Sequence, residues 1–298
     1  MQIPAYLKKG DTVAIIATAR KISKEEIEPA ILFLKSYGLS VLCGEHLFKV
    51  DHQFAGTDLQ RSSDLQWALN HKDIKAIIIA RGGYGTIKLL ENIDFTAFKN
   101  NPKWIVGYSD VTVLHSAIHL LGIASLQATM PINFSKNKDA TKSLVDALFG
   151  EYQVITCEPN FLNKEGSATG VLVGGNLSLL YTLSGTPYEI DTTDKILFIE
   201  DIDEYLYHID RMMMHLKLAG KLKHLKGLVV GGMTDMKDNT VSFGKIEEEI
   251  ILDAVKEYDY PVCFNFPAGH VDKNLALYFG KEIKLEVKSN TVNLNFLA

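Results

Sequence analysis

The segment IKAIIIA at residues 74–80, followed directly by RGGYG at 81–85, is the most informative part of this sequence for the fold. Its nearly continuous run of isoleucine and alanine is typical of a strand buried on both faces, as in a parallel sheet covered by helices. The closely spaced glycines permit a tight turn, and a helical pattern over 84–92 follows. The segment therefore predicts one strand–turn–helix step of a parallel α/β sheet.

The same alternation extends outward through the first half of the chain. Ser23 and Glu26 have the spacing of a capping box at the start of a helix over 23–37. Strand and helix patterns alternate five times, which favours a parallel sheet with helices on both faces. The other strands are expected at 12–17, 39–43, 104–107 and 123–127, and the other helices at 58–70, 110–120 and 140–149.

The pattern changes after Gly150. Residues 151–167 show no clear period and contain Pro159, Asn160, Asn163, Gly166 and Ser167, so we interpret them as a linker. We therefore predict an α/β protein with a first domain at 1–150 and a mixed α/β domain of different build at 168–298. In the second domain we expect strands near 168–173, 196–199, 227–230 and 262–265, a long helix over 204–219, and a β-hairpin from 283–287 and 291–295.

Composition limits the class of protein. With 47% hydrophobic and 22% charged residues among 298, the chain has ordinary globular composition. Its net charge of −5 gives no basic excess of the kind that nucleic-acid binding requires. No apolar run approaches the ~18 residues that span a bilayer, so no membrane partner is expected.

The cysteines and the N-terminus bear on the compartment. Cys43, Cys157 and Cys263 are far apart and form no Cys-x-x-Cys pair, so we expect buried free thiols rather than disulfides or a zinc site. The apolar run near the N-terminus is too short for a secretion signal. We therefore expect a cytoplasmic protein.

Chemistry is expected just after the strands, because ligands of open parallel sheets bind outside the carboxyl ends of the strands. The RGGYG segment can aim backbone N–H groups at an anion or an oxyanion, or it can simply be a tight turn. It matches neither the dinucleotide fingerprint nor the Walker A loop.

A second candidate is GYSD at 107–110, which also joins a strand to a helix. It half-matches the G-x-S-x-G nucleophile elbow, with Val111 in place of the second glycine. Ser109 would then be a nucleophile close to a helix N-terminus, which favours developing negative charge. Alternatively, Ser109 or Asp110 caps the helix, and the two roles can coexist.

The third candidate pairs two residues of the second half. Glu200 directly follows the strand at 196–199, and His270 ends the segment PAGH at 267–270. A serine nucleophile needs a base, and the base needs a third group that fixes its tautomer. Ser109, His270 and Glu200 can fill these roles, whereas the alternative is a turn histidine and a surface carboxylate.

The order of five motifs resembles one known family, the LD-carboxypeptidases, which include muramoyltetrapeptide carboxypeptidase and the microcin-C immunity peptidase. The resemblance extends over essentially the whole chain. The motifs are RGGYG at 81–85, GYSD at 107–110, GGNLS at 174–178, LFIED at 197–201 with YHIDRM at 207–212, and FPAGH at 266–270.

This resemblance implies a flavodoxin-like N-terminal domain and a C-terminal swivelling α/β domain. It also implies that Ser109 is the nucleophile, His270 the general base and Glu200 its acid partner, with the backbone N–H groups of Gly83 and Asp110 as oxyanion donors. Members are usually homodimers and need no metal or other cofactor. The main family activity removes the terminal D-Ala from cytoplasmic murein tetrapeptides by cutting the bond after the L-centre of a diamino acid, which recycles cell-wall fragments.

Substrate contacts are less specified. Arg81 is a candidate for binding the free carboxylate, and Gly175 and Asn176 are candidates for lining the substrate cleft. One alternative activity is an immunity-type peptidase that cleaves aminoacyl- or peptidyl-adenylates, which needs an aromatic platform for the base, but both tryptophans, Trp67 and Trp104, lie in the first half. Another is a catalytically silent sensor of small ligands, against which the three triad residue types at strand ends argue.

Overall fold

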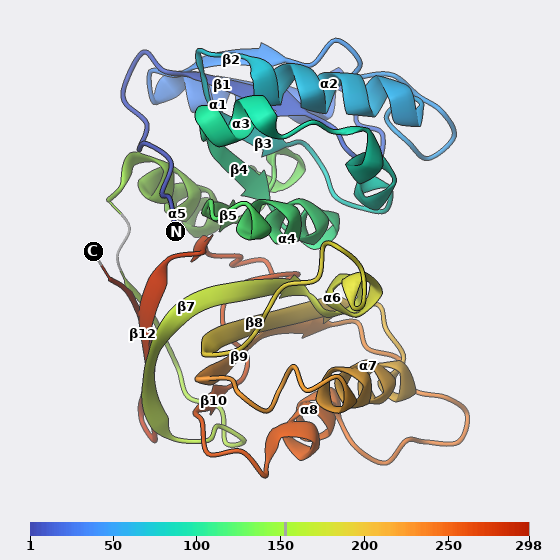
Figure 1. Cartoon of the computed structure of the whole chain (residues 1–298), viewed down its shortest axis with the longest axis vertical. Helices are drawn as coiled ribbons and strands as arrows, with labels where there is room; N and C mark the ends of the chain where they lie inside the picture. The colour runs from blue at the N-terminus through green and yellow to red at the C-terminus, as the bar shows by residue number, and fades with distance from the viewer. Residues whose placement is uncertain (152–153, 298) are drawn as a thin grey trace. The chain divides into compact units, whose positions relative to one another are not determined.

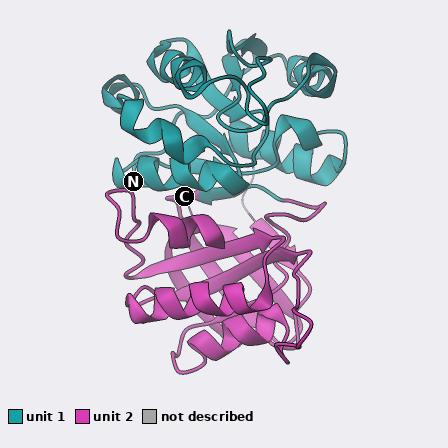
Figure 2. Ribbon diagram, turned by 90° about the vertical axis from the view of Figure 1, so that its right-hand side faces the viewer, with its two compact units in different colours: residues 1–152, 275–278 teal, residues 153–274, 279–298 magenta. Residues whose placement is uncertain are grey.

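In the computed structural model the isoleucine-rich run forms strand β3 (Ile74–Ile79), whose residues are almost all buried. The structure describes residues 1–151 and 154–297. The chain divides into two units, drawn in two colours in Figure 2. One unit comprises Met1–Tyr152 and Leu275–Tyr278, and the other comprises Gln153–Asn274 and Phe279–Ala298.

The first unit is built on a six-stranded sheet in the order β11-β5-β4-β3-β1-β2 (Figure 1). The pairs β1–β2, β1–β3, β3–β4 and β4–β5 are all parallel. The order 2-1-3-4-5 is that of flavodoxin-like sheets, which confirms the predicted fold class. The bounds are β1 (Thr12–Ile16), β2 (Ser40–Cys43), β4 (Trp104–Gly107), β5 (Ser125–Gln127) and β11 (Leu277–Phe279).

The helices of this unit follow the predicted pattern with local differences. Ser23 and Glu26 form both hydrogen bonds of the predicted capping box at the start of α1 (Lys24–Ser36). The helix predicted over 84–92 is instead the 3-10 segment η1 (Thr86–Asn92), the tighter form that short connections adopt. The remaining helices are α2 (Asp58–Asn70), α3 (Thr96–Asn100), η2 (Ser109–Val111), α4 (Thr112–Leu120), η3 (Pro131–Asn133) and α5 (Lys138–Phe149).

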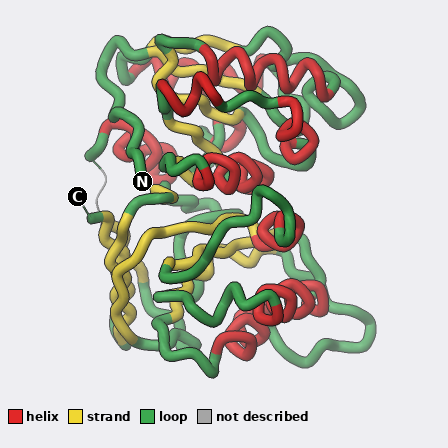
Figure 3. Tube along the Cα trace, viewed as in Figure 1, coloured by secondary structure: helices red, strands yellow, loops and turns green. Residues whose placement is uncertain are grey.

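The second unit is built on a seven-stranded sheet in the order β10-β9-β8-β7-β12-β13-β6. Its first four strands are parallel, and the last three join by antiparallel pairing. The predicted C-terminal hairpin is confirmed, and Figure 3 shows the strands of this sheet together. The strands are β6 (Val154–Cys157), β7 (Gly166–Asn176), β8 (Lys195–Ile202), β9 (Gly227–Thr234), β10 (Val262–Cys263), β12 (Glu282–Lys288) and β13 (Thr291–Phe296).

Three helices accompany this sheet: α6 (Leu177–Leu183), α7 (Leu206–Leu218) and α8 (Glu247–Val255). Ile209, Met213 and Leu216 of α7 belong to one apolar core with the buried side chains of β8 and β9. Burying such a stripe against a sheet is the main stabilising contribution of an amphipathic helix.

The segment predicted to be a linker, residues 151–167, contributes strand β6. This strand pairs with β13 and buries Ile155 between the exposed Val154 and Thr156. Tyr152 and Gln153 of that segment lie outside the described residues. The chain also returns once to the first unit. The Tyr278 hydroxyl donates to the Ala147 carbonyl at 2.6 Å, and its ring lies 5.5 Å from that of Trp104.

Across residues 1–151 and 154–297, no helix combines the length and apolarity that a membrane crossing requires.

Candidate active site

Ser109 occupies a sharp turn at the carboxyl end of β4. Its φ of +63° lies in the left-handed region, which is unusual for a residue other than glycine. Ser109 is partly exposed, whereas Tyr108 and Asp110 on either side are buried. A strained strand-to-helix turn that projects a serine is the arrangement of a nucleophile elbow.

The alternative interpretation of this turn as a helix cap is wrong. Among the described residues, no side chain caps the first turn of η2 or α4. The Asp110 carboxylate instead accepts a hydrogen bond from the backbone N–H of Thr86, 24 residues earlier, at 2.8 Å.

The glycine loop, residues 82–85, lies directly beside Ser109, since β3 and β4 are neighbours in the sheet. A Cβ on Gly82 would lie 3.2 Å from Cβ and 3.3 Å from Oγ of Ser109. Gly83 has a φ of +122°, and a Cβ there would lie 2.4 Å from Cγ of Arg20. The loop therefore brings bare backbone to the serine, as an oxyanion hole requires.

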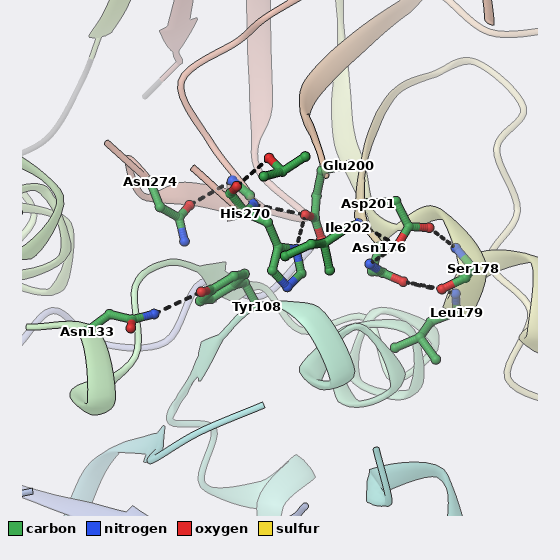
Figure 4. A network of polar contacts seen from close by, with 12 residues as sticks. Tyr108, Asn133, Asn176, Ser178, Leu179, Glu200, Asp201, Ile202, His270 and Asn274 are labelled. Carbon is green, nitrogen blue, oxygen red and sulfur yellow. Dashed lines mark hydrogen bonds and ion pairs between the residues drawn. The ribbon is translucent and has the colours of Figure 1, made fainter. Parts of the chain in front are cut away.

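Glu200 and His270 form a hydrogen-bonded pair within the second unit (Figure 4). Nδ1 of His270 lies 2.5 Å from Oε2 of Glu200, and the backbone N–H of His270 donates to the same oxygen at 3.0 Å. Glu200 is 0% exposed, so its interpretation as a surface carboxylate is wrong. Because a carboxylate only accepts hydrogen bonds, Nδ1 carries the proton and Nε2 is left as the basic nitrogen.

The environment of His270 raises its pKa above the ordinary value. Burial by itself lowers the pKa, but the negative charge of Glu200 and its hydrogen bond outweigh burial, and Asp201 adds to the rise. A histidine with this partner is a stronger base than an isolated one.

Two side chains that the sequence analysis missed, those of Thr234 and Asn274, support the backbone of His270 and Gly269. Oγ1 of Thr234 donates to the His270 carbonyl at 2.6 Å, and Oδ1 of Asn274 accepts from the N–H of Gly269 at 2.8 Å. Gly269 has a φ of +95°, and a Cβ there would lie 2.7 Å from the Glu200 side chain. The Gly-His order in the motif is the only sequence signal that points to this close approach.

Replacing Gly269 with alanine is expected to displace the Glu200 side chain and lower the pKa of His270 toward its ordinary value. The clash should cost about 1–3 kcal/mol of stability beyond the backbone strain. Gly220→Ala is a matched control, because Gly220 has a φ of +74° with open space around it, and strain alone costs about 1–2 kcal/mol. NMR titration of His270 and thermal unfolding measure both effects. Equal results for the two variants would contradict the role of Gly269.

Asn176 and Gly175 lie at the end of β7, where Asn176 pairs in register with Glu200 of β8. Nδ2 of Asn176 donates to Oδ1 of Asp201 at 2.8 Å, and the backbone N–H of Ser178 donates to the other carboxylate oxygen at the same distance (Figure 4). Asp201 is 2% exposed, so its carboxyl group is buried beside Glu200. Burial and the neighbouring Glu200 raise its pKa to about 7.

Arg81 lines a pocket of about 480 Å³ together with Lys21, Lys24, Glu26 and Phe48. Its guanidinium lies 3.8 Å from the Glu26 carboxylate. The pocket is formed by segments that follow β1, β2 and β3, with the switch in strand order between β1 and β3. Flavodoxin-like sheets bind ligands at that point.

Ser109 and the glycine loop belong to the first unit, whereas Glu200 and His270 belong to the second. The predicted triad joins residues of both units and stays a prediction. Within the described residues, no group of three or more His, Cys, Asp or Glu side chains has a metal-binding arrangement.

Comparison with known proteins gives matches to both halves of the chain. Residues 13–128 match the model of the LD-carboxypeptidase N-terminal domain, and residues 169–285 match that of the LD-carboxypeptidase C-terminal domain. The chain is 36% identical to a probable murein peptide carboxypeptidase of Bacillus subtilis, over 97% of this chain and 92% of the relative. It is 27% identical to the murein tetrapeptide carboxypeptidase of Pseudomonas aeruginosa, over 92% of each.

Solved structures agree with this result. The muramoyltetrapeptide carboxypeptidase from Oxalobacter formigenes superposes with a TM-score of 0.87 at 28% identity, over 96% of this chain and 99% of that one. The microcin C7 self immunity protein has the same fold, with a TM-score of 0.88 at 21% identity over the full length of both chains. Since the two family models together span most of its length, this chain belongs to the LD-carboxypeptidase family and is a serine-type carboxypeptidase.

Proposed function

We propose that this enzyme removes the terminal D-Ala from murein tetrapeptides by hydrolysing the bond after the L-centre of the diamino acid. The reaction would belong to the recycling of cell-wall fragments in the cytoplasm. The observation that carries the proposal is the buried Glu200 that fixes the His270 tautomer, together with Ser109 in a strained turn beside a bare glycine loop. The names of the Bacillus and Pseudomonas relatives support the choice of substrate.

In this proposal Oγ of Ser109 attacks the carbonyl carbon of the diamino acid while Nε2 of His270 takes the hydroxyl proton. Glu200 stabilises the imidazolium that forms. The N–H groups of Gly83 and Asp110 receive the negative charge that develops on the carbonyl oxygen. The imidazolium then protonates the leaving amine of D-Ala, and water hydrolyses the acyl-enzyme by the same steps.

The substrate of a carboxypeptidase carries a free carboxylate, which must be recognised. We place it on Arg81, whose pocket also contains Lys21 and Lys24. The choice is supported by the position of Arg81 directly before Gly82, where an added Cβ would lie 3.3 Å from Oγ of Ser109. Asn176 and Gly175 are proposed to line the cleft, since Asn176 pairs in register with Glu200.

Replacing Arg81 with methionine is expected to raise KM by about 10- to 100-fold, since a hydrogen bond to a charged group contributes about 1.5–3 kcal/mol. The value of kcat should change less, because the contact is present in the ground state as well as in the transition state. A tetrapeptide that ends in D-alaninamide is the matched control substrate. The wild type should discriminate strongly against the amide, and the variant should not. Unchanged discrimination in the variant would remove Arg81 from carboxylate binding.

The proposed function itself is tested by incubating the protein with murein tetrapeptides that carry lysine or diaminopimelate at the third position. Release of D-Ala is expected, and a peptide that ends in L-Ala should not be cleaved. Turnover of an adenylated peptide without release of D-Ala would refute the proposal in favour of the immunity-type activity. Light scattering of the same preparation tests whether this chain forms the homodimer that the family resemblance implies.

A further inference from the structure

The Asp110 side chain connects the nucleophile turn with the glycine loop. Asp110 follows Ser109 directly and is 1% exposed. Its Oδ2 accepts from the backbone N–H of Thr86 at 2.8 Å. Thr86 is the residue at which the glycine loop, residues 82–85, ends and η1 begins. The carboxylate therefore holds the far end of the loop that approaches Ser109.

A buried polar network supports this contact from behind. Oγ1 of Thr86 donates to Oγ1 of Thr18 at 2.7 Å, and the Arg61 guanidinium donates to the Thr18 carbonyl at 2.6 Å. Arg61 is 1% exposed and its guanidinium lies 4.8 Å from the centre of the Phe54 ring. Thr18, Phe54, Thr86 and Asp110 follow β1, β2, β3 and β4 in turn. The network thus joins the segments after four neighbouring strands.

The charges in this network are complementary. Burial raises the pKa of the Asp110 carboxyl, whereas hydrogen bonds from Thr86 and Gly85 and the positive charge of Arg61 oppose the rise. A buried polar group is costly unless it is hydrogen-bonded, so the contact of Oδ2 with Thr86 holds the carboxyl group in a defined place, while Oδ1 has no hydrogen-bond partner among the described residues.

The glycine loop needs such an external contact. Gly83 and Gly85 have φ values of +122° and +142°, and glycine backbones lose more freedom on ordering than any other residue. An oxyanion donor is effective only when it is aimed before the reaction begins. A loop of three glycines in four residues has few side chains of its own to fix the direction of its N–H groups.

We propose that the Asp110 carboxylate is a positioning residue that orients the glycine loop so that the Gly83 N–H faces the developing oxyanion. The inference rests on the proposed function. Asp110 then sets both donors, one through its own backbone N–H and the other through its side chain. Substitution of the side chain leaves the backbone N–H of residue 110 in place, so a loss of rate reports on the carboxylate.

The test compares Asp110→Ala, Asp110→Asn and Thr141→Val. The alanine variant lacks the acceptor, while the asparagine variant keeps a carbonyl oxygen that can accept from Thr86. Thr141 is a matched control in the same unit, because its buried side chain also hydrogen-bonds to the backbone, by donating to the carbonyls of Phe134 and Asn137. Hydrogen exchange of the amides at 82–87 and the kcat and KM for release of D-Ala are measured for each.

Asp110→Ala is expected to speed amide exchange in the loop and to lower kcat by about 10²–10³-fold, the effect of losing one oxyanion donor, with KM within a few-fold of the wild type. Asp110→Asn should restore much of the slow amide exchange in the loop and much of the wild-type kcat. Thr141→Val should lower the melting temperature and leave both loop exchange and kcat unchanged. If the alanine variant does not fold, the asparagine variant is decisive, with slower turnover expected at a normal melting temperature.

Unchanged exchange in the loop would overturn the proposal, and so would faster exchange with an unchanged kcat. A wild type that releases no D-Ala would refute the proposed function, and the inference about catalysis would fall with it. Hydrogen exchange of the amides at 82–87 would still show separately whether Asp110 holds the loop.

Discussion

Replacing Ser109 with alanine is expected to lower kcat for release of D-Ala by about 10⁴-fold or more, because removing a serine nucleophile leaves only binding and oxyanion stabilisation. Binding of the tetrapeptide should persist, since the Arg81 pocket and the glycine loop are unchanged. Steady-state kinetics and calorimetric binding measure the two quantities. Mass spectrometry of the wild type during turnover should also detect an acyl group on the peptide that contains Ser109.

Ser36→Ala is the control for this substitution, since Ser36 is an exposed serine at the end of α1 whose hydroxyl donates only locally, to the Phe33 carbonyl. It should keep full activity. A Ser109→Ala variant that keeps wild-type kcat would exclude Ser109 as the nucleophile and with it the predicted triad.

Replacing Glu200 with glutamine is expected to lower kcat by about 10³–10⁴-fold, because an amide can donate to Nδ1 of His270 and so favour the wrong tautomer. The pH dependence should change as well. His270 acts as a base only when neutral, so activity is lost as the pH falls through its pKa. In the wild type the pKa is raised, and the acid limb of kcat/KM should lie above the ordinary value of about 6.5.

Without the Glu200 charge, the acid limb should move down by about 1–3 pH units, since burial then acts on His270 with less opposition. Asp201→Asn is the matched comparison, because Asp201 also raises the pKa of His270, while its carboxylate accepts hydrogen bonds from Asn176 and Ser178. Asp201→Asn should shift the acid limb of kcat/KM less than Glu200→Gln does. An acid limb that stays in place in Glu200→Gln would show that Glu200 does not set the basicity of His270.

Much of the first unit could be predicted because its signals are local. The isoleucine run of β3 and the capping box of α1 each involve residues close together in the chain. The missed elements depend on distant partners. Strand β6 forms because it pairs with β13, more than a hundred residues away, and β11 is only three residues long.

In the candidate site, too, local signals were predictable from the sequence and contacts with distant partners were not. Strand ends and residue types were enough to single out Ser109, Glu200 and His270. The direction of the Asp110 side chain was not predictable, because a carboxylate at that turn can cap its own helix or bond to Thr86. The choice depends on how β3 and β4 align in the sheet. The support of His270 by Thr234 likewise comes from a neighbouring strand, β9, and no residue of the motif FPAGH indicates it.

The return of residues 275–278 to the first unit has a consequence for dissecting the molecule. Strand β11 covers the edge of β5, and Tyr278 packs against Trp104. A fragment that stops near residue 150 would lack this covering strand and would expose the hydrogen-bonding groups of β5, a surface prone to aggregation. The two family segments are therefore not modules that can be exchanged by a single cut, and any chimera must carry the short C-terminal insertion along with the N-terminal sheet.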